Sequence, residues 1–172
     1  MAPPAFDPGD IGDIMSGSRN GRIAVIANAG SGKKAQGDDP TDVLVRLLGP
    51  DAQVHSFQPG DNIATHVGTA IAEGAQTIVA SGGDGTIMAV ADALAGTDVT
   101  MGIMPSGTFN FFARGMGIPP DPELAADIIR DGQVQSLSLG TVNGKVFLNN
   151  MSIGIYPAIL REREQVYGRW GR

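Results

Sequence analysis

The 172-residue sequence predicts a single α/β domain built on a parallel sheet, with an antiparallel hairpin near its C-terminal end. Short, almost continuous apolar runs alternate with segments of helical periodicity, as expected for strands buried on both faces and the helices that connect them. Glycine-rich segments follow three of these runs, and ligands of parallel sheets bind beyond the carboxyl ends of the strands. The dipeptide Asn143-Gly144, within residues 133–154, is typical of a tight hairpin turn.

Four strands are expected, at residues 22–28, 52–57, 76–81 and 99–104. Each is a short run that is mainly apolar, and a helix-length segment separates it from the next. This spacing favours parallel pairing through right-handed crossover connections.

The connecting segments predict helices that each have one apolar face. Thr41 is expected to cap the first helix, and Asp61 to begin the second. A third helix directly follows residues 81–86, and a fourth is expected at residues 122–130. The core-facing residues of the first three are Val43, Leu44, Leu47, Leu48, Ile63, Val67, Ala70, Ile71, Ile87, Val90, Ala91 and Leu94.

Composition and charge exclude several classes of protein. A net charge of −6 argues against a general nucleic-acid binder, which would present a basic surface to the phosphates. The absence of cysteine excludes disulfides, thiolate metal sites and cysteine nucleophiles. No apolar run approaches the roughly 18–20 residues that span a bilayer. Residues 1–20 lack the pattern of a secretory signal, so we expect a disordered leader and a cytoplasmic location.

The first glycine-rich loop, NAGSGKK, follows the strand at residues 22–28. Its glycines would let backbone N–H groups turn towards an anion, with Ser31 and Lys33 or Lys34 adding a hydroxyl and positive charge. It does not match the P-loop pattern. It does match the loose dinucleotide fingerprint, but the second strand lacks the acidic end that this reading needs, and a plain flexible loop is the alternative.

The second loop, SGGDGT at residues 81–86, joins a strand directly to a helix. The free N–H groups at the start of that helix would attract an anion. Asp84 would repel a polyphosphate unless a divalent cation lies between them, or unless its carboxylate accepts the proton of an attacking hydroxyl. Both roles belong to phosphoryl transfer. The structural alternative makes Asp84 or Thr86 an ordinary helix cap.

The third loop, PSGTFNFFAR, follows the strand at residues 99–104. Gly107, Thr108 and Asn110 are candidates to contact phosphates or to hold the other loops. Arg114 lies one helical turn beyond Asn110. We expect the aromatic residues Phe109, Phe111 and Phe112 mainly in the core or in an interface.

The chain resembles the nucleotide-binding domain of the diacylglycerol kinase catalytic family, which includes bacterial lipid kinases and sphingosine kinases. Four motifs carry the resemblance, from about Arg22 onwards. They are Asn28-Ala-Gly-Ser-Gly32, Ser81-Gly-Gly-Asp-Gly-Thr86, Pro105-Ser-Gly-Thr-Phe-Asn110 with Ala113-Arg114, and Asn150-Met-Ser-Ile-Gly154.

The resemblance implies a Rossmann-like sheet at residues 21–158 that binds ATP and Mg²⁺, and a second, all-β domain to which residues 159–172 would lead. It implies that ATP phosphorylates a lipid hydroxyl, that the second domain supplies a candidate base for that hydroxyl, and that the protein contacts the inner membrane face peripherally. The charge argument above makes Asp84 the expected catalytic residue, as a magnesium ligand or as a base. Ala29 replaces the proline usual after Asn28, and Phe111 replaces a common acidic residue. The nucleotide contacts are expected among Asn28, Ala29, Gly30, Ser31, Gly32, Lys33, Gly82, Gly83, Asp84, Gly85, Thr86, Gly107, Thr108 and Asn110.

Two other functions remain open from the sequence. NAD kinases share the GGDGT turn, so a kinase with a soluble acceptor is one alternative. A nucleotide-binding module without catalysis is the other, because the second domain that would complete the cleft is expected to be missing from this chain. The acceptor lipid and the oligomeric state are not indicated by the sequence.

Overall fold

The computed structural model describes residues 21–28, 39–50 and 52–148, which form the predicted α/β arrangement. Four parallel strands make one sheet in the order β2-β1-β3-β4. Every strand boundary lies within one residue of the prediction. The strands are β1 (Arg22–Asn28), β2 (Gln53–Phe57), β3 (Ala75–Gly82) and β4 (Thr100–Pro105).

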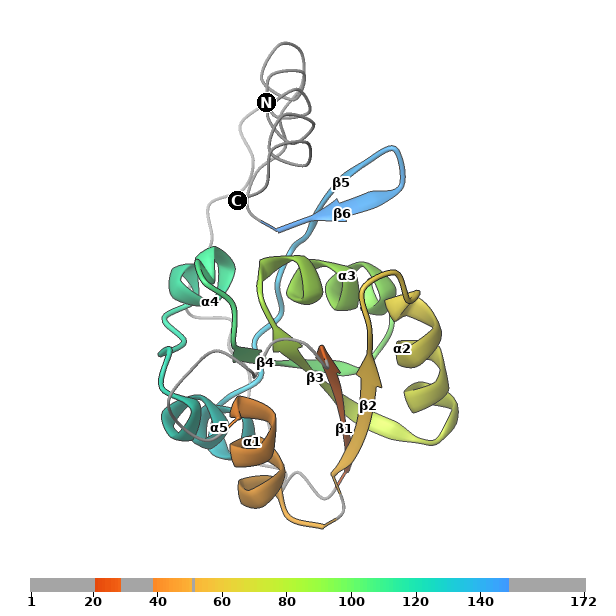
Figure 1. Ribbon diagram of the computed structural model, residues 1–172. Helices are drawn as coiled ribbons and strands as arrows, with labels where there is room; N and C mark the ends of the chain where they lie inside the picture. Colours follow the sequence, from red (N-terminus) through yellow and green to blue (C-terminus); the bar gives the residue numbers. More distant parts are fainter. Residues whose placement is uncertain (1–20, 29–38, 51, 149–172) are drawn as a thin grey trace, which may run out of the picture.

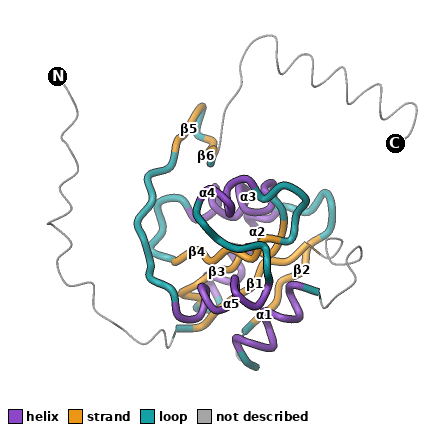
Figure 2. The backbone as a smooth tube through the Cα atoms, turned by 90° about the vertical axis from the view of Figure 1, so that its left-hand side faces the viewer, coloured by secondary structure: helices purple, strands orange, loops and turns teal. Residues whose placement is uncertain are grey.

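Helices cover both faces of this sheet, so the fold has three layers (Figure 1). One face carries α1 (Pro40–Leu48) and α5 (Pro122–Asp131), and the other carries α2 (Ile63–Ala72) and α3 (Asp84–Leu94). Figure 2 shows the strands between these two helix pairs. The short helix α4 (Phe111–Gly115) lies beside α3.

Alternating side chains of the central strands supply two separate cores. In β1, Ala24 and Ile26 pack towards α2 and α3, whereas Val25 and Ala27 pack towards α1 and α5. All four are at most 4% exposed, so β1 is apolar on both faces. This burial explains why the strand appears in the sequence as a continuous apolar run rather than an alternating one.

The first two helices begin at caps other than those predicted. Asp39, not Thr41, caps α1, because its carboxylate accepts a 2.8 Å hydrogen bond from the Thr41 N–H. Asn62, not Asp61, caps α2 by accepting from the Ala64 N–H. The Asp61 carboxylate instead accepts from the Gln58 N–H in the preceding turn. Adjacent polar residues compete for the cap position, and the direction of the incoming chain decides between them.

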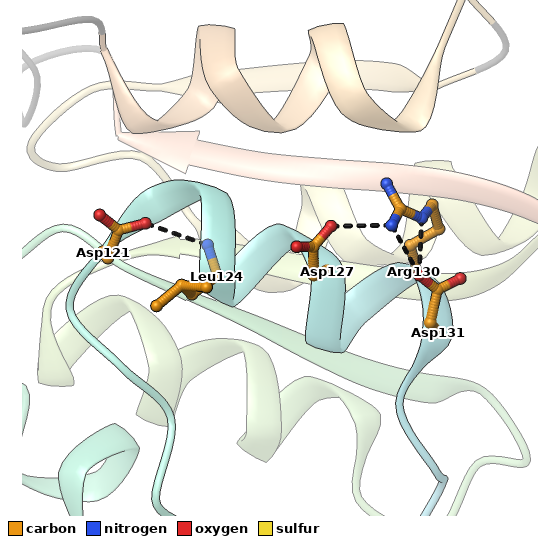
Figure 3. A network of polar contacts seen from close by, with 5 residues as sticks. All are labelled: Asp121, Leu124, Asp127, Arg130 and Asp131. Carbon is orange, nitrogen blue, oxygen red and sulfur yellow. Dashed lines mark hydrogen bonds and ion pairs between the residues drawn. The ribbon is translucent and has the colours of Figure 1, made fainter.

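Helix α5 is held at both ends by side-chain hydrogen bonds (Figure 3). At its start, the Asp121 carboxylate accepts from the Leu124 N–H at 3.0 Å. At its end, Arg130 contacts Asp127 at 2.8 Å and also pairs with Asp131. These two carboxylates raise the pKa of Arg130, with Asp131 contributing the larger effect.

The predicted hairpin is present, but it is shorter than residues 133–154. Its described strands are β5 (Gly140–Val142) and β6 (Lys145–Phe147), and they pair antiparallel. Asn143 and Gly144 have φ values of 49° and 74°, as a two-residue turn of this kind requires. Residues 133–139 are in no strand, although their sequence is strand-like.

The hairpin is attached to α3 through one carboxylate. Asp92 accepts a 2.9 Å hydrogen bond from the Val146 N–H and lies 3.3 Å from the Lys145 ammonium. Figure 1 shows the hairpin next to α3. The Val146 N–H, assisted by Lys145, holds the pKa of Asp92 below its ordinary value of 3.8.

Candidate functional site

Two of the three predicted loops meet at the carboxyl edge of the sheet. Gly82 at the end of β3 is paired with Pro105 at the end of β4, so the loops that follow begin side by side. Ala27 in β1 is paired with Ser81, which brings Asn28 to the same edge. Ala29, Gly30, Ser31, Gly32 and Lys33 of the first loop, and the motif at residues 150–154, lie outside the described residues.

The second and third loops touch backbone to backbone, and glycine makes this contact feasible. A Cβ atom on Gly107 would lie 2.5 Å from the Gly83 Cα, which no real side chain tolerates. The Ser106 N–H also donates to the Gly82 carbonyl at 3.0 Å. The sequence predicted an anion-binding role for these glycines and did not reveal that two of them are needed for contact between the loops.

The glycines of residues 81–86 are under different constraints. A Cβ atom on Gly82 would lie 2.5 Å from the side chain of Thr86, which is itself buried. Gly85 is exposed, and nothing lies within 4 Å of the position that its Cβ would take. Glycine weakens a helix at such a position by up to about 1 kcal/mol relative to alanine, so packing does not explain this choice.

The start of α3 has no side-chain cap among the described residues. Gly83 occupies the cap position, so the alternative in which Asp84 or Thr86 serves as the cap is wrong. A hydrogen bond from the Ile87 N–H to the Gly83 carbonyl begins the helical pattern. The N–H groups of Asp84, Gly85 and Thr86 precede it, at the positive end of the helix dipole. This arrangement is the geometry that anions occupy at helix N-termini.

Asp84 joins the two loops. Its Oδ1 accepts a 3.1 Å hydrogen bond from the Phe112 N–H in the first turn of α4. The bond is part-buried, and it connects the start of α3 to the start of α4. A carboxylate at the first position of α3 is also favoured by the dipole of that helix.

Asn110 fixes the shape of the third loop. It has a left-handed backbone, with φ of 49°. Its side-chain Oδ1 accepts from the Gly107 N–H at 3.0 Å, and its Nδ2 donates to the Gly107 carbonyl at 2.9 Å. These bonds hold the loop that contains Asn110 itself, which is neither of the two roles predicted for it, contact with phosphates and holding the other loops. Thr108 lies within the clamped segment and is exposed.

A hydroxyl pair that the sequence did not reveal connects α1 to this edge. The Thr41 Oγ1 lies 2.9 Å from the Ser81 Oγ, and Ser81 is only 1% exposed. Because Thr41 is in the first turn of α1, this contact places a second helix N-terminus beside the end of β3. Both residues looked like ordinary polar residues at the ends of elements, so no sequence signal distinguished them.

Of the three phenylalanines expected in the core or in an interface, the partly buried Phe112 lies against the core, and an interface for Phe109 and Phe111 stays a prediction. Phe109 and Phe111 are 63% and 58% exposed. Their rings stack in parallel, with centroids 5.4 Å apart and planes 5° apart. The left-handed turn at Asn110 separates these two residues and turns their rings out of the core.

The described residues contain no cluster of three or more histidine or acidic side chains that could hold a metal ion alone. A groove of about 610 Å³ along β4 has a mainly apolar lining that includes Ile103, Leu137 and Leu148. Its lining contains none of residues 81–86 or 105–110, so it is separate from the glycine loops. No helix in the described part of the chain is long and apolar enough to cross a membrane.

A parallel sheet with glycine loops and a helix N-terminus converging at its carboxyl edge is typical of α/β proteins that bind phosphate groups. The model of the diacylglycerol kinase catalytic domain matches residues 22–142. The chain therefore belongs to the diacylglycerol kinase catalytic domain family.

Individual relatives agree with this family. The chain is 34% identical over 125 residues to a diacylglycerol kinase of Mycobacterium tuberculosis, a match that covers 71% of this chain and 40% of that protein. It is 47% identical over 137 residues to a probable lipid kinase YegS-like of Pseudomonas aeruginosa, covering 78% of this chain and 39% of that protein.

A crystal structure of a diacylglycerol kinase from Bacillus anthracis has the same fold. It matches with a TM-score of 0.61 and 28% identity, over 75% of this chain and 46% of that one. The matched part therefore spans about 40% of the length of the two curated relatives and under half of this crystallised one.

Proposed function

We propose that this chain is the ATP-binding part of a lipid kinase, which transfers the γ-phosphoryl group of ATP to a hydroxyl group of a lipid. The observation that carries the proposal is the uncapped N-terminus of α3, whose first residues lie against the third glycine loop. Membership of a family whose relatives are named as lipid and diacylglycerol kinases favours a lipid acceptor over NAD.

In this proposal the loops bind the phosphates through backbone groups. The N–H groups of Asp84, Gly85 and Thr86 donate to phosphate oxygens, and the exposed Gly85 leaves room for them to approach. Thr108 adds a hydroxyl from the third loop. Residues 28–33 supply the remaining contacts. The second and third loops are held by Asn110 and by the contact between Gly83 and Gly107, so little order has to be created in these two loops when ATP binds.

The reaction is an in-line displacement at phosphorus. The lipid hydroxyl oxygen forms a bond to the γ-phosphorus as the bond from that phosphorus to the β–γ bridging oxygen breaks. ADP leaves, and the hydroxyl proton passes to a carboxylate. We assign this role to Asp84 because its Oδ1 accepts from the Phe112 N–H, whereas its second carboxylate oxygen has no partner among the described residues.

Asp84 also fits a magnesium site of the usual kinase kind. Mg²⁺ is commonly held by one or two carboxylates together with substrate phosphates and water, and Asp84 would be one such carboxylate. When bound, the ion would neutralise charge on the phosphate oxygens. We place the reaction in the cytoplasm, at the inner face of the membrane, where ATP and a lipid acceptor meet.

The test combines ATP binding with acceptor choice. Titration calorimetry with ATP and MgCl₂ should show binding to the 172-residue chain, and we expect no turnover from this chain alone. In the full-length protein, γ-labelled ATP should label a diacylglycerol or sphingoid-base dispersion and leave NAD unlabelled. Labelling of NAD alone would replace this proposal with a soluble-substrate kinase, and ATP binding without any transfer would indicate a non-catalytic module.

Asp84→Asn separates catalysis from folding. Asparagine retains an oxygen that can accept from the Phe112 N–H, so the denaturation midpoint should stay close to that of the parent. Labelling of the lipid should fall by about 100-fold or more, because the charge that binds metal or accepts the proton is lost. Activity within a factor of about three of the parent would remove Asp84 from the mechanism.

A further inference from the structure

The stacked rings of Phe109 and Phe111 form an exposed apolar surface that belongs to neither core of the described residues. Both side chains are more than half exposed, although their inner ring faces already cover each other. Exposed aromatic surface of this kind marks an interaction site more often than a scattered single residue does. We call Phe109, Phe111 and Arg114 the aromatic edge.

The aromatic edge is held rigidly. Phe109 is flanked by Gly107, which lies against the backbone of Gly83, and by Asn110, which clamps the loop through two hydrogen bonds. Phe111 begins α4, whose first turn is tied to α3 through the Phe112 N–H and Asp84. Binding through these rings would therefore cost little conformational entropy.

The local charge indicates the kind of partner. Arg114 follows Phe111 by three residues in α4, so both side chains are on the same side of the helix. It is the sole charged residue between positions 105 and 120, in a chain with a net charge of −6. Among the described residues Arg114 is exposed and makes no ion pair. Aromatic rings beside an arginine match an interface of acyl chains and anionic headgroups.

We propose that the aromatic edge inserts into the surface of an anionic lipid bilayer and presents the glycine loops to it. The direction of approach rests on the proposed function, because a hydroxyl at the headgroup level would then lie beside the start of α3. Apolar side chains at such a surface are buried by about 5–10 Å, at the boundary between headgroups and acyl chains. The assignment of the aromatic edge as a membrane-binding surface rests only on the exposure, stacking and charge described above.

Vesicle flotation of the full-length protein without ATP tests the proposal separately from catalysis. The parent should bind phosphatidylglycerol-containing vesicles and bind pure phosphatidylcholine vesicles more weakly. Phe109→Ala/Phe111→Ala should reduce partitioning by about tenfold. The matched control, Val54→Ala/Val134→Ala, removes apolar side chains that are 43% and 48% exposed elsewhere, and it should bind like the parent. Arg114→Gln should weaken binding only to the anionic vesicles.

A spectroscopic variant covers the case in which the double alanine protein does not fold. In the 172-residue chain, Phe109→Trp in a Trp170→Phe background places the single tryptophan on the aromatic edge. Its emission should shift to the blue when anionic vesicles are added.

Three results would overturn the proposal. One is equal partitioning of the parent and the double alanine variant. Another is loss of ATP affinity with unchanged vesicle binding, which would assign the rings to the nucleotide base. The third is self-association that the double variant abolishes, which would make a second copy the partner.

Discussion

Gly107 lies so close to Gly83 that even a methyl group would overlap the facing backbone. The atoms in the way belong to the main chain, which cannot rotate aside as a flexible side chain can. Gly85 has the opposite surroundings, since no atom lies within contact distance of its missing Cβ. Glycine is therefore needed at position 107 for the packing of the two loops, whereas glycine at position 85 leaves space for a ligand to approach the start of α3.

Substitution of each glycine by alanine should reveal the difference. Gly107→Ala should lower the free energy of unfolding by about 1–3 kcal/mol, because the two loops must move apart. Gly85→Ala should leave it unchanged or raise it by up to about 1 kcal/mol, while weakening ATP binding. Urea denaturation and calorimetry measure the two effects. Equal stability of the two variants would show that the contact between the loops adjusts without cost.

At the scale of elements, Asp92 holds the hairpin to the last turn of α3. A negative charge there is opposed by the helix dipole, so the Val146 N–H and the Lys145 ammonium have to compensate for it. The hairpin has only two strands, and such a pair is marginal in water without a surface to pack on. The attachment at Asp92 is therefore expected to determine whether β5 and β6 stay in place.

Acid should release the hairpin. The attached state lowers the pKa of Asp92, so the contact contributes its full stabilisation above pH 3.8 and loses it as the pH falls through the lowered pKa. Amide exchange at Val146 should accelerate below that pH while exchange in β3 stays slow.

Asp92→Ala should produce the same loss of protection at neutral pH, corresponding to about 1 kcal/mol. Asp92→Asn, which keeps an acceptor oxygen, is the matched control and should have an intermediate effect. Unchanged exchange at Val146 in the alanine variant would mean that packing alone holds the hairpin.

For the whole molecule, the candidate site is built from segments distant in the sequence. Ser81 is joined to Thr41, Asp84 to Phe112, and Gly82 to Ser106. A ligand bound to these loops therefore contacts several elements of the sheet at once. Its binding free energy should stabilise the domain as a unit.

ATP with MgCl₂ should accordingly raise the unfolding midpoint of the 172-residue chain. At a concentration 100 times the Kd, the gain is about 2.7 kcal/mol. Differential scanning calorimetry at several nucleotide concentrations measures the shift of the midpoint. Adenosine at the same concentrations is the control, because it carries the base and the sugar without the phosphates. A midpoint that does not move with ATP would contradict the proposed site, whereas an equal shift with adenosine would place recognition on the base.

Local patterns were sufficient for the four strands of the sheet and for the hairpin turn, but they did not predict α4 or the absence of a strand at residues 133–139. Apolar runs located the four strands of the sheet, and Asn143-Gly144 located the hairpin, because burial on both faces and positive φ restrict the residue types that can occupy these positions. The choice between adjacent caps was beyond such patterns. Asp39 and Asn62 are the caps because of the direction from which the chain enters each helix. The type of a single residue does not indicate this direction.

The sequence by itself determined the parallel α/β class, the family and the loops that end at one edge of the sheet, because periodicity, turn chemistry and motif order are local properties. Only the tertiary structure decided what each loop residue does. It assigned Gly83 and Gly107 to contact between backbones, Asn110 to clamping, and Phe109 and Phe111 to the surface. These roles depend on which loops pack together at the edge of the sheet. The contacting residues are far apart in the chain, so no local sequence pattern reveals the contact.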